Sequence, residues 1–570
     1  MSKRDQATVI STDVLVIGGG LSGLVAAIKA RESGVDVLVV ERATVGWAGQ
    51  ATKAGNGLWV VGPEDSVDEF LEYHVRNLGE YLNDQTLMYS YAKDSFNAIE
   101  QLWQWGVQVT RNKEGKLGTF KHPVAPWSQV GVELDIMEVL RKTALKAGVK
   151  TINKVHIAEL LKEGDRVVGA VGFGLIDMAF HVFRAKATIM ATAGGNYRCA
   201  WFNSYGDGIA AAYRAGTEMR NAEFANMFDV VDKNTGLPLY GAHHLVYNAL
   251  GQNISDRYDP KAPDVSVRLA MGMEKEVLEG RGPFYVDSTQ MDHIRAVIGG
   301  EGKKPGIVNG MVRLFPKKLG WNGRLMAKGM KYGPPFNPKP EVTLEFISEC
   351  SPIRVNHEMK TTVVGLWATG SASWNGSAWQ GALPPPGNIR GTGLMTALLS
   401  GLRAGPSAAE HASGTDAVNT ADGDVNRLRK AVFAPIGRTG GVSPADAMEG
   451  IISLMTKAKY SYRRSKDRLE EALRKVDEIR GALSNLTAKD GHGLGKCYEA
   501  KGLALCAELT FRSALARTES RGSHFREDYP LRDDKNWLKW IILKDQGGEM
   551  AVSTDPVPIE RYKVKPPDTP

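Results

Sequence analysis

Cysteine is scarce in this chain of 570 residues, which contains only Cys199, Cys350, Cys497 and Cys506. No two of them have C-x-x-C spacing, so the chain lacks the local thiolate pairs that bind structural zinc or an iron–sulfur cluster. We therefore expect no metal site here, and any cluster must lie on another polypeptide. Unpaired thiols and the lack of an apolar leader after the charged start favour a cytoplasmic location, with any membrane association made through partners.

Long apolar runs and a dominant charge are also lacking. No window approaches the roughly 20 apolar residues that a membrane-spanning helix requires, so we expect no transmembrane segment. Lys and Arg total 71 against 64 Asp and Glu, and a surplus of +7 is too dilute over this length to predict nucleic-acid binding. The composition leaves a small-molecule substrate, a protein partner or an oligomer, in a chain long enough for about three or four domains.

A β-α-β unit is predicted near the start of the chain. The apolar run 13–17 is typical of a strand buried on both faces, and the motif GGGLSG at 18–23 follows it directly. A small-residue helix is expected over 24–30, and a second apolar run, 35–40, ends at Glu41. The unit thus has G-x-G-x-x-G at its first turn and an acidic residue at the tip of its second strand, which predicts a dinucleotide site.

Each of these residue types has a physical role in such a site. Gly18 and Gly20 let the backbone approach a pyrophosphate at the start of the helix, and Gly23 lets the helix lie against the strand. Glu41 is placed to accept hydrogen bonds from ribose hydroxyl groups.

Later segments repeat the pattern of an apolar strand that runs into glycines. They are 187–195 and 364–370, and an apolar helix is expected to start at Gly393. A long cofactor that crosses one domain requires such separated segments, and FAD fits this arrangement better than NAD. The further cofactor-binding candidates are Arg42, Ala193, Gly194, Asp207, Gly370, Gly393 and Leu394.

Changes in local composition and in hydrophobic periodicity along the chain predict its domains. Residues 226–345 are rich in glycine, proline and charge, as in an inserted domain, and apolar residues recur near a 3.6 period after about residue 425. We expect an α/β fold: a Rossmann-like FAD-binding domain, an inserted α+β capping domain and a C-terminal helical domain. The expected ranges are 1–225 and 346–424 for FAD binding, 226–345 for the cap, 425–545 for the helical domain and 546–570 for an extended proline-rich tail that buries no core.

Two motifs resemble those of the fumarate reductase and succinate dehydrogenase flavoprotein superfamily: RTESRGSHFREDYP at 517–530 and NSYGDG at 203–208. Within it, EGRGPFY at 279–285 makes the chain most similar to the adenylylsulfate reductase α subunit. The resemblance implies FAD and a separate ferredoxin-like iron–sulfur subunit that carries the cluster. Members of the superfamily often tether FAD through a histidine, but 46–57 contains none, so we expect non-covalent FAD.

The resemblance also implies catalytic candidates. Arg268 and Arg390 match active-site arginines of the family, and a guanidinium binds carboxylate, sulfate or phosphate in a fixed bidentate geometry. His243 and His244 lie in an expected strand, 242–247, whose alternation points their side chains to opposite faces. We assign proton transfer to His243, since imidazole exchanges a proton near neutral pH. The candidate substrate-binding residues are Asn56, His244 and Trp379. For each, the alternative is a structural role.

The sequence therefore predicts an FAD-dependent oxidoreductase. It would transfer a hydride or electron pair between flavin N5 and a small polar or anionic substrate, and exchange electrons with the iron–sulfur subunit. The dicarboxylate motifs of the superfamily are missing, and the tryptophan-rich stretch 374–379 favours an alternative: a self-contained flavin dehydrogenase or desaturase of an alicyclic or aromatic compound. A flavin-bearing structural subunit of a larger complex is the third possibility.

Overall fold

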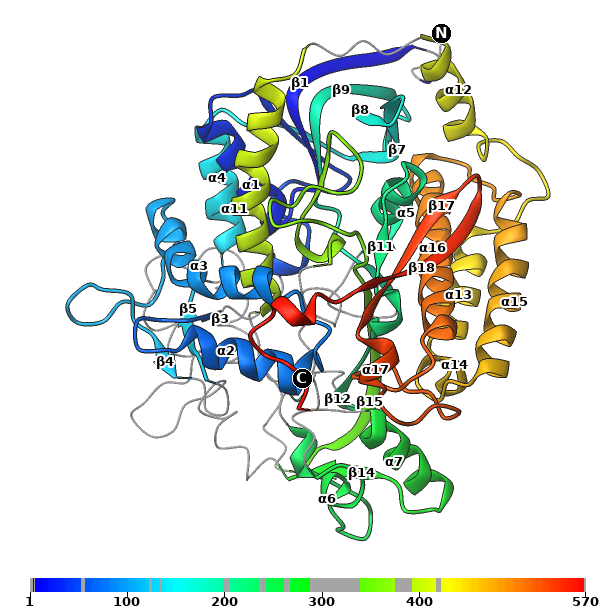
Figure 1. Cartoon of the computed structure of the whole chain (residues 1–570). Coiled ribbons are helices and arrows are strands. Elements are labelled where there is room, and N and C mark those ends of the chain that lie inside the picture. The colour runs from blue at the N-terminus through cyan, green and yellow to red at the C-terminus, as the bar shows by residue number, and fades with distance from the viewer. Residues whose placement is uncertain are drawn as a thin grey trace.

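A computed structural model of the chain describes residues 4, 6–52, 57–121, 126–133, 135–197, 204–234, 239, 242–260, 267–287, 339–374, 392–416 and 422–567. Figure 1 shows the first sheet and its helices at one end, the helical region along one side and the inserted segment at the opposite end. Among the described residues, no helix is long and apolar enough to cross a bilayer.

The expected β-α-β unit is present as β1 (Ala7–Ile17), α1 (Leu21–Glu32) and β2 (Val37–Glu41). β1 and β2 pair in parallel, and the sheet runs β6-β2-β1-β9-β8-β7, with β16 also on β9. The other strands are β6 (Lys150–Asn153), β7 (Val155–Glu163), β8 (Arg166–Gly174), β9 (Phe180–Met190) and β16 (Leu366–Ala368). The last four residues of β1, from Val14 to Ile17, are buried, which explains why all four are apolar.

Small residues let two helices approach each other closely on this sheet. A Cβ added to Gly405 of α11 (Thr392–Ser413) would lie 2.4 Å from the Ala26 carbonyl oxygen of α1. The late helix α11 is thereby held against the first helix of the chain. The other elements around it are α2 (Val67–Tyr73), the π-helix η2 (His74–Leu78), α3 (Gln85–Gln104), α4 (Ile136–Lys146), η1 (Gln50–Thr52) and a small sheet of β3 (Gly57–Val60), β4 (Phe120–Lys121) and β5 (Ser128–Gly131).

The inserted segment forms a second sheet that is tied back to the first domain. Its elements are β12 (Asn226–Asp232), η4 (Ala242–Leu245), β13 (Val246–Tyr247), α6 (Ile254–Tyr258), α7 (Val267–Leu278), β14 (Phe284–Val286) and β15 (Glu341–Cys350). β15 runs antiparallel to β12 and also pairs with β10 (Gly195–Tyr197), with Cys350 opposite Gly195. The strand that ends the insertion thus returns the chain to the loop after β9.

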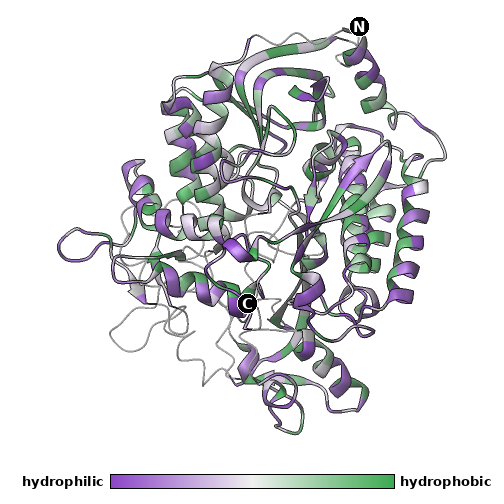
Figure 2. Cartoon of the chain, in the orientation of Figure 1, coloured by the Kyte–Doolittle hydropathy of each residue, from purple (hydrophilic) through white to green (hydrophobic). Residues whose placement is uncertain are grey.

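The helical region consists of α12 (Asp422–Phe433), α13 (Pro444–Met455), α14 (Ala458–Ser461), α15 (Lys466–Leu483), α16 (Gly491–Ala516) and α17 (Asp534–Trp537). Figure 2 shows hydrophilic and hydrophobic residues alternating along α15, which is amphipathic and buries only one side. α16 is buried over most of its length, because it lies between α13 and α15 on one side and α5 (Asp207–Arg214) on the other. This long helix therefore joins the helical region to the first domain.

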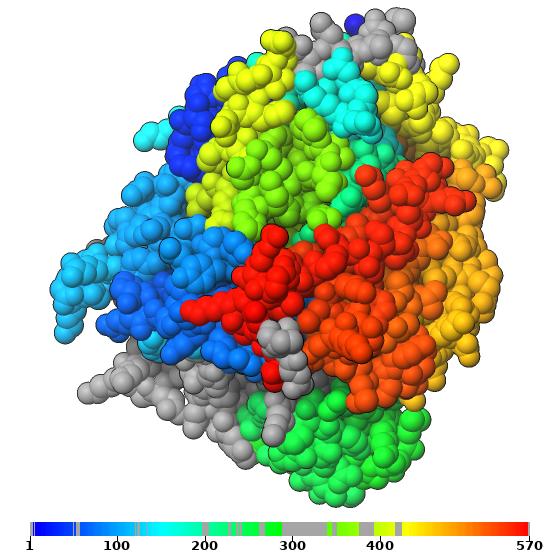
Figure 3. Space-filling view, in the orientation of Figure 1, coloured from blue at the N-terminus to red at the C-terminus, as the bar shows by residue number. Residues whose placement is uncertain are grey.

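The expectation of an extended tail over 546–570 is wrong. β17 (Lys539–Gln546) and β18 (Glu549–Pro556) form a hairpin that pairs with β11 (Met219–Arg220), and the short helix η7 (Ile559–Arg561) follows. Val557, Tyr562 and Val564 are buried. Figure 3 shows this red segment crossing the front of the molecule to the blue N-terminal region. Pro556 ends β18, and apolar side chains after it are still buried. β17 also begins within the range 425–545 that we expected to be helical.

Candidate functional site

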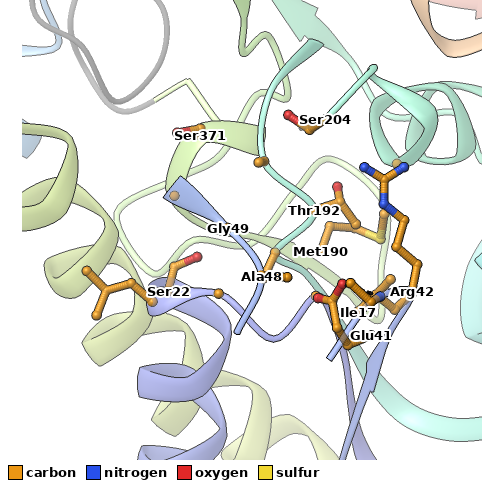
Figure 4. A pocket seen from close by; sticks show the side chains of 18 of the residues that line it. Ile17, Ser22, Glu41, Arg42, Ala48, Gly49, Met190, Thr192, Ser204 and Ser371 are labelled. Carbon is orange, nitrogen blue, oxygen red and sulfur yellow. Dashed lines mark hydrogen bonds between the residues drawn. The ribbon is translucent and has the colours of Figure 1, made fainter. Parts of the chain in front are cut away.

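A cavity lies where the parallel strands β1, β2 and β9 end, at Ile17, Glu41 and Met190. Its wall is assembled from segments far apart in the sequence. It includes most of the expected cofactor-binding residues: Gly18, Gly20, Glu41, Arg42, Ala193, Asp207, Gly370, Gly393 and Leu394. In Figure 4, Arg42 extends along one side of the cavity, and Ser22 and Ser371 lie on the opposite side. Ligands of open parallel sheets bind at this edge.

The glycine turn is shaped by steric limits. Gly18 has a φ of +109°, and a Cβ on it would lie 2.3 Å from the Ala191 carbonyl oxygen, so no other residue fits. A Cβ on Gly23 would lie 2.0 Å from the Gly18 carbonyl oxygen. Gly23 therefore lies behind the turn and does not line the cavity. It serves the close helix packing that the sequence predicts for it.

The start of α1 is open to an anion. Gly20, its N-cap residue, provides no side-chain cap, so the first N–H groups of the helix are left for a ligand. Nothing lies within 4 Å of the position that a Cβ on Gly20 would take. This open space beside uncapped N–H groups fits the pyrophosphate of a dinucleotide.

Charged residues gather at the end of the cavity next to β2. Arg42 Nη1 lies 2.5 Å from Glu499 Oε1 and 3.9 Å from Asp207 Oδ1. Burial by itself would raise the pKa of Asp207, but Arg42 and His156 lower it below its usual value. Burial lowers the pKa of His156 to about 4, against the opposing charge of Asp207. The imidazole is therefore neutral at neutral pH, and Arg42 and Asp207 are charged.

The far end of the cavity is formed by η6 (Gly370–Ala372) and the start of α11. Gly370 has a φ of +58° and donates its N–H to the Ser400 hydroxyl of α11 at 2.9 Å. This bond fixes the turn against the helix. Gly393 and Leu394, in the first turn of α11, line the cavity, where the positive end of the helix dipole favours negative charge. Gly194, also expected to bind the cofactor, does not line it.

The cavity wall also includes Trp47 and His156, which were not among the sequence-based candidates. Trp47 lines the wall with 47% of its surface exposed, and it lies between Gly46 and Gly49, both of which have positive φ. An aromatic residue flanked by glycines after the acidic strand end is a signal that the sequence does carry. His156 had no such signal, because only the placement of β7 in the sheet brings it to the cavity.

The histidine pair lies elsewhere and is not in a strand. His243 and His244 belong to η4, and their ring centroids are 3.8 Å apart, so the expected placement on opposite strand faces is wrong. A 3₁₀ turn places successive side chains about 120° apart, not 180°. His243 is buried, whereas His244 is exposed with its Nδ1 3.3 Å from the Ser255 hydroxyl. Neither lines the cavity described above.

Arg268, the one arginine candidate that the structure describes, does not line this cavity. Arg268 is exposed on α7 and lines a second cavity, with Arg463 and Phe525 of the helical region. Arg281, in the motif at 279–285, pairs with buried Glu276 of α7 at 2.6 Å, a contact that braces the end of this helix. Three candidates lie outside the described residues: Asn56, Trp379 and Arg390.

The motif at 517–530 forms a buried ionic network. Arg517 donates to Glu223 and Glu519 at 2.8 Å each, and all three side chains are fully buried. Glu223 belongs to η3 (Ala222–Phe224), directly before the chain enters the inserted segment. The network therefore joins the helical region to the base of that segment. Within the described residues, no group of three or more His, Cys, Asp or Glu side chains could hold a metal ion.

Known proteins match this chain in sequence and in fold. A family model described as an FAD binding domain matches residues 13–230, and a model of the fumarate reductase flavoprotein C-terminus matches residues 451–569. The chain is 24% identical over 575 residues to one of the subunits of the fumarate reductase (CoM/CoB) of Methanothermobacter marburgensis, a match that covers 94% of this chain and 98% of the relative.

Solved structures agree at the level of the fold. Adenylylsulfate reductase of Archaeoglobus fulgidus superposes with a TM-score of 0.75 at 21% identity, over 97% of each chain. A quinol-fumarate reductase with bound menaquinol gives a TM-score of 0.80 at 18% identity, over 97% of this chain and 99% of that chain. The expected α/β fold with FAD-binding and C-terminal parts is thus confirmed.

Proposed function

Because the chain belongs to the fumarate reductase and succinate dehydrogenase flavoprotein superfamily and is an FAD-dependent oxidoreductase, we propose that it is the flavoprotein component of a two-component enzyme. It would exchange an electron pair with a small polar or anionic substrate and pass electrons to or from a separate iron–sulfur subunit.

The observation that carries this proposal is the continuous cavity from Glu41 to Gly393. Its wall of separated segments suits FAD, which supplies reversible two-electron chemistry when bound. The start of α1 would hold the pyrophosphate, and Glu41 the adenosine ribose. The start of α11 would lie by the far end of the cofactor and favour negative charge there.

A separate cluster-bearing partner is supported by the cysteine content. The four cysteines, at 199, 350, 497 and 506, are too far apart in sequence to form a local ligand set. The relative from Methanothermobacter marburgensis is itself named as one subunit of its enzyme. Electrons that leave this chain would therefore go to a cofactor held by another polypeptide.

The substrate side of the proposal rests on cationic and proton-carrying groups. We keep Arg390, which lies outside the described residues, as the candidate for anion binding. We keep His243 as the candidate for proton transfer, although it does not line the cavity described above. Arg268 lines a different cavity, so a role in substrate binding requires α7 to move toward the FAD cavity. Substitution of each by alanine, with flavin content as the control, tests the assignments one at a time.

The deciding experiment starts with the purified protein and any partner that accompanies it. Acid denaturation should release FAD into the supernatant, as expected for a cofactor without a covalent tether. The photoreduced protein is then mixed without oxygen with fumarate, adenylylsulfate or a cyclic enone, and reoxidation is followed by visible absorption. Reoxidation by an anionic substrate together with iron in a co-purified subunit supports the proposal.

The same experiment separates the alternatives. Reoxidation by cyclic enones alone, in a preparation without iron, would favour a self-contained dehydrogenase or desaturase. No reoxidation by any compound would favour a structural flavin-bearing subunit. Either result contradicts the two-component enzyme proposed here.

A further inference from the structure

We propose that Glu499 of α16 is a positioning residue for the FAD site, which holds Arg42 in place at the adenosine end of the cavity. The inference rests on FAD binding in this cavity and not on the substrate or the partner. It assigns a part of cofactor binding to the helical region, from which no residue lines the cavity.

The contact itself is short and largely removed from water. Arg42 Nη1 donates to Glu499 Oε1 at 2.5 Å, and the two side chains are 25% and 9% exposed. The second carboxylate oxygen of Glu499 accepts from Lys496 Nζ at 2.6 Å. Both oxygens of Glu499 are therefore engaged, one of them by Arg42.

Glu499 reaches the cavity only through Arg42. Arg42 and Asp207 line the cavity and Glu499 does not. Arg42 directly follows Glu41, which is expected to bind the ribose, so the guanidinium stands beside the adenosine half of the cofactor. A direct structural effect of Glu499 on the FAD site would then pass through the position of this guanidinium.

Competition among carboxylates explains why the position needs to be fixed. Arg42 is attracted by Asp207, Glu499 and Glu41, the charges that raise its pKa against the effect of burial. A guanidinium released from Glu499 can turn further toward Glu41, which lines the cavity and is expected to bind the ribose. The 2.5 Å contact to Glu499 holds Arg42 at 3.9 Å from Asp207 and leaves Glu41 for the ribose.

The docking of α16 sets the distance of this contact. A Cβ on Gly502 would lie 2.4 Å from the backbone nitrogen of Asp207, so the helix touches the first residue of α5 directly. Gly502 is three residues after Glu499, about one helical turn. The backbone contact and the ionic contact therefore occur on the same side of α16, and the first fixes the geometry of the second.

The test measures FAD affinity in the full chain, without substrate or partner. Glu499→Gln keeps the shape of the side chain and removes its charge, and we expect the Kd for FAD to rise by roughly tenfold, the usual cost of one hydrogen bond to a charged group. Glu508→Gln is the matched control, because Glu508 is also a buried carboxylate of α16 but pairs with Arg480 and Arg512, which do not line the cavity. Its Kd should stay within about twofold of the wild type.

A double-mutant cycle shows whether the effect passes through Arg42. In an Arg42→Gln background, Glu499→Gln should cause no further loss of FAD affinity. The melting temperatures of the FAD-free variants should not correlate with their Kd values for FAD. Additive losses, an unchanged Kd for Glu499→Gln or an equal loss for Glu508→Gln would overturn the assignment.

A further variant covers the case in which Glu499→Gln does not fold. Lys496→Met leaves Glu499 to Arg42 alone, so FAD should bind as tightly as in the wild type or more tightly, and weaker binding would overturn the proposal. If the wild type itself binds no FAD, the proposed function fails. If the wild type binds FAD and Glu499→Gln and Glu508→Gln have the same Kd for FAD, only this inference fails.

Discussion

The carboxylate of Glu41 accepts a hydrogen bond from the backbone N–H of Gly19 at 2.8 Å, which ties the tip of β2 to the glycine turn after β1. Its other oxygen accepts from the N–H of Ala43, also at 2.8 Å. The residue expected to bind a ribose thus also holds the loop that approaches the pyrophosphate.

Removing this carboxylate should therefore lower both FAD affinity and stability. In Glu41→Ala, the buried N–H of Gly19 loses its partner, which costs about 1–3 kcal/mol of unfolding free energy. Urea denaturation of the FAD-free protein and titration with FAD measure the two effects. Glu32→Ala is the control, because Glu32 is exposed and its ion pair with Lys29 is a surface contact. A loss of affinity without any loss of stability would contradict the structural part of this role.

Two glycines of the same turn should respond differently to alanine. In Gly18→Ala, the new methyl group would lie 2.3 Å from the Ala191 carbonyl oxygen, and alanine would have to adopt a φ of +109°. We therefore expect the unfolding free energy of the FAD-free protein to decrease by more than ~2 kcal/mol. Gly20→Ala meets no atom within 4 Å and should change stability by less than about 1 kcal/mol.

Gly20 lines the cavity, however, so its new methyl group would occupy space needed by the cofactor. Gly20→Ala should therefore lose FAD affinity while it keeps its melting temperature. Equal thermal stability of the two FAD-free variants would show that the steric account of Gly18 is wrong.

Acid should destabilise the protein through its buried histidines. Burial lowers the pKa of His74 to about 3 and that of His156 to about 4, from 6.5 in an open chain. Between pH 6.5 and about 4, the unfolded chain therefore binds protons that the folded protein does not, and stability falls as the pH falls through this window.

His74→Phe tests this directly, since the ring stays between Phe70 and Trp127 but no longer titrates. As the pH is lowered, its unfolding free energy should decrease less steeply than that of the wild type, and the two slopes should differ by up to ~1.4 kcal/mol per pH unit. Melting curves across this range make the comparison, and parallel curves would exclude His74 as the cause.

The C-terminal segment should contribute to stability. Tyr562 is 8% exposed in a cluster with Trp540 and Val557, so Tyr562→Ala should cost about 3 kcal/mol or more. Its neighbour Lys563 is the matched control, because its ion pair with Asp68 is exposed and Lys563→Ala should cost less than about 1 kcal/mol. Similar unfolding free energies for both variants would contradict the packing described here.

The sequence allowed the nucleotide-binding part to be predicted because its signals are local. The apolar run of β1, the turn at Gly18 and the acidic end of β2 each follow from requirements of neighbouring residues. The later returns at Gly370 and Gly393 carry the same signal, and the cavity brings them together with the first motif.

The remaining parts depend on distant contacts. Nothing in the alternation around His243 and His244 separates a strand from a 3₁₀ turn, since the segment is short. The prolines of the tail predicted an unpacked segment, but Val564 exchanges two hydrogen bonds with Gln85, a residue 479 positions earlier. Glu499 reaches Arg42 across 457 positions. The sequence pattern within the tail or within α16 does not predict these contacts with distant residues.

The order of the cavity wall along the chain has a consequence for biosynthesis. Its first residues, from Ile17, leave the ribosome long before its last, which extend to Ala397. The FAD-binding cavity therefore cannot be complete until about seven-tenths of the chain has been synthesised. We therefore expect FAD to bind late in translation or after the chain has been released from the ribosome.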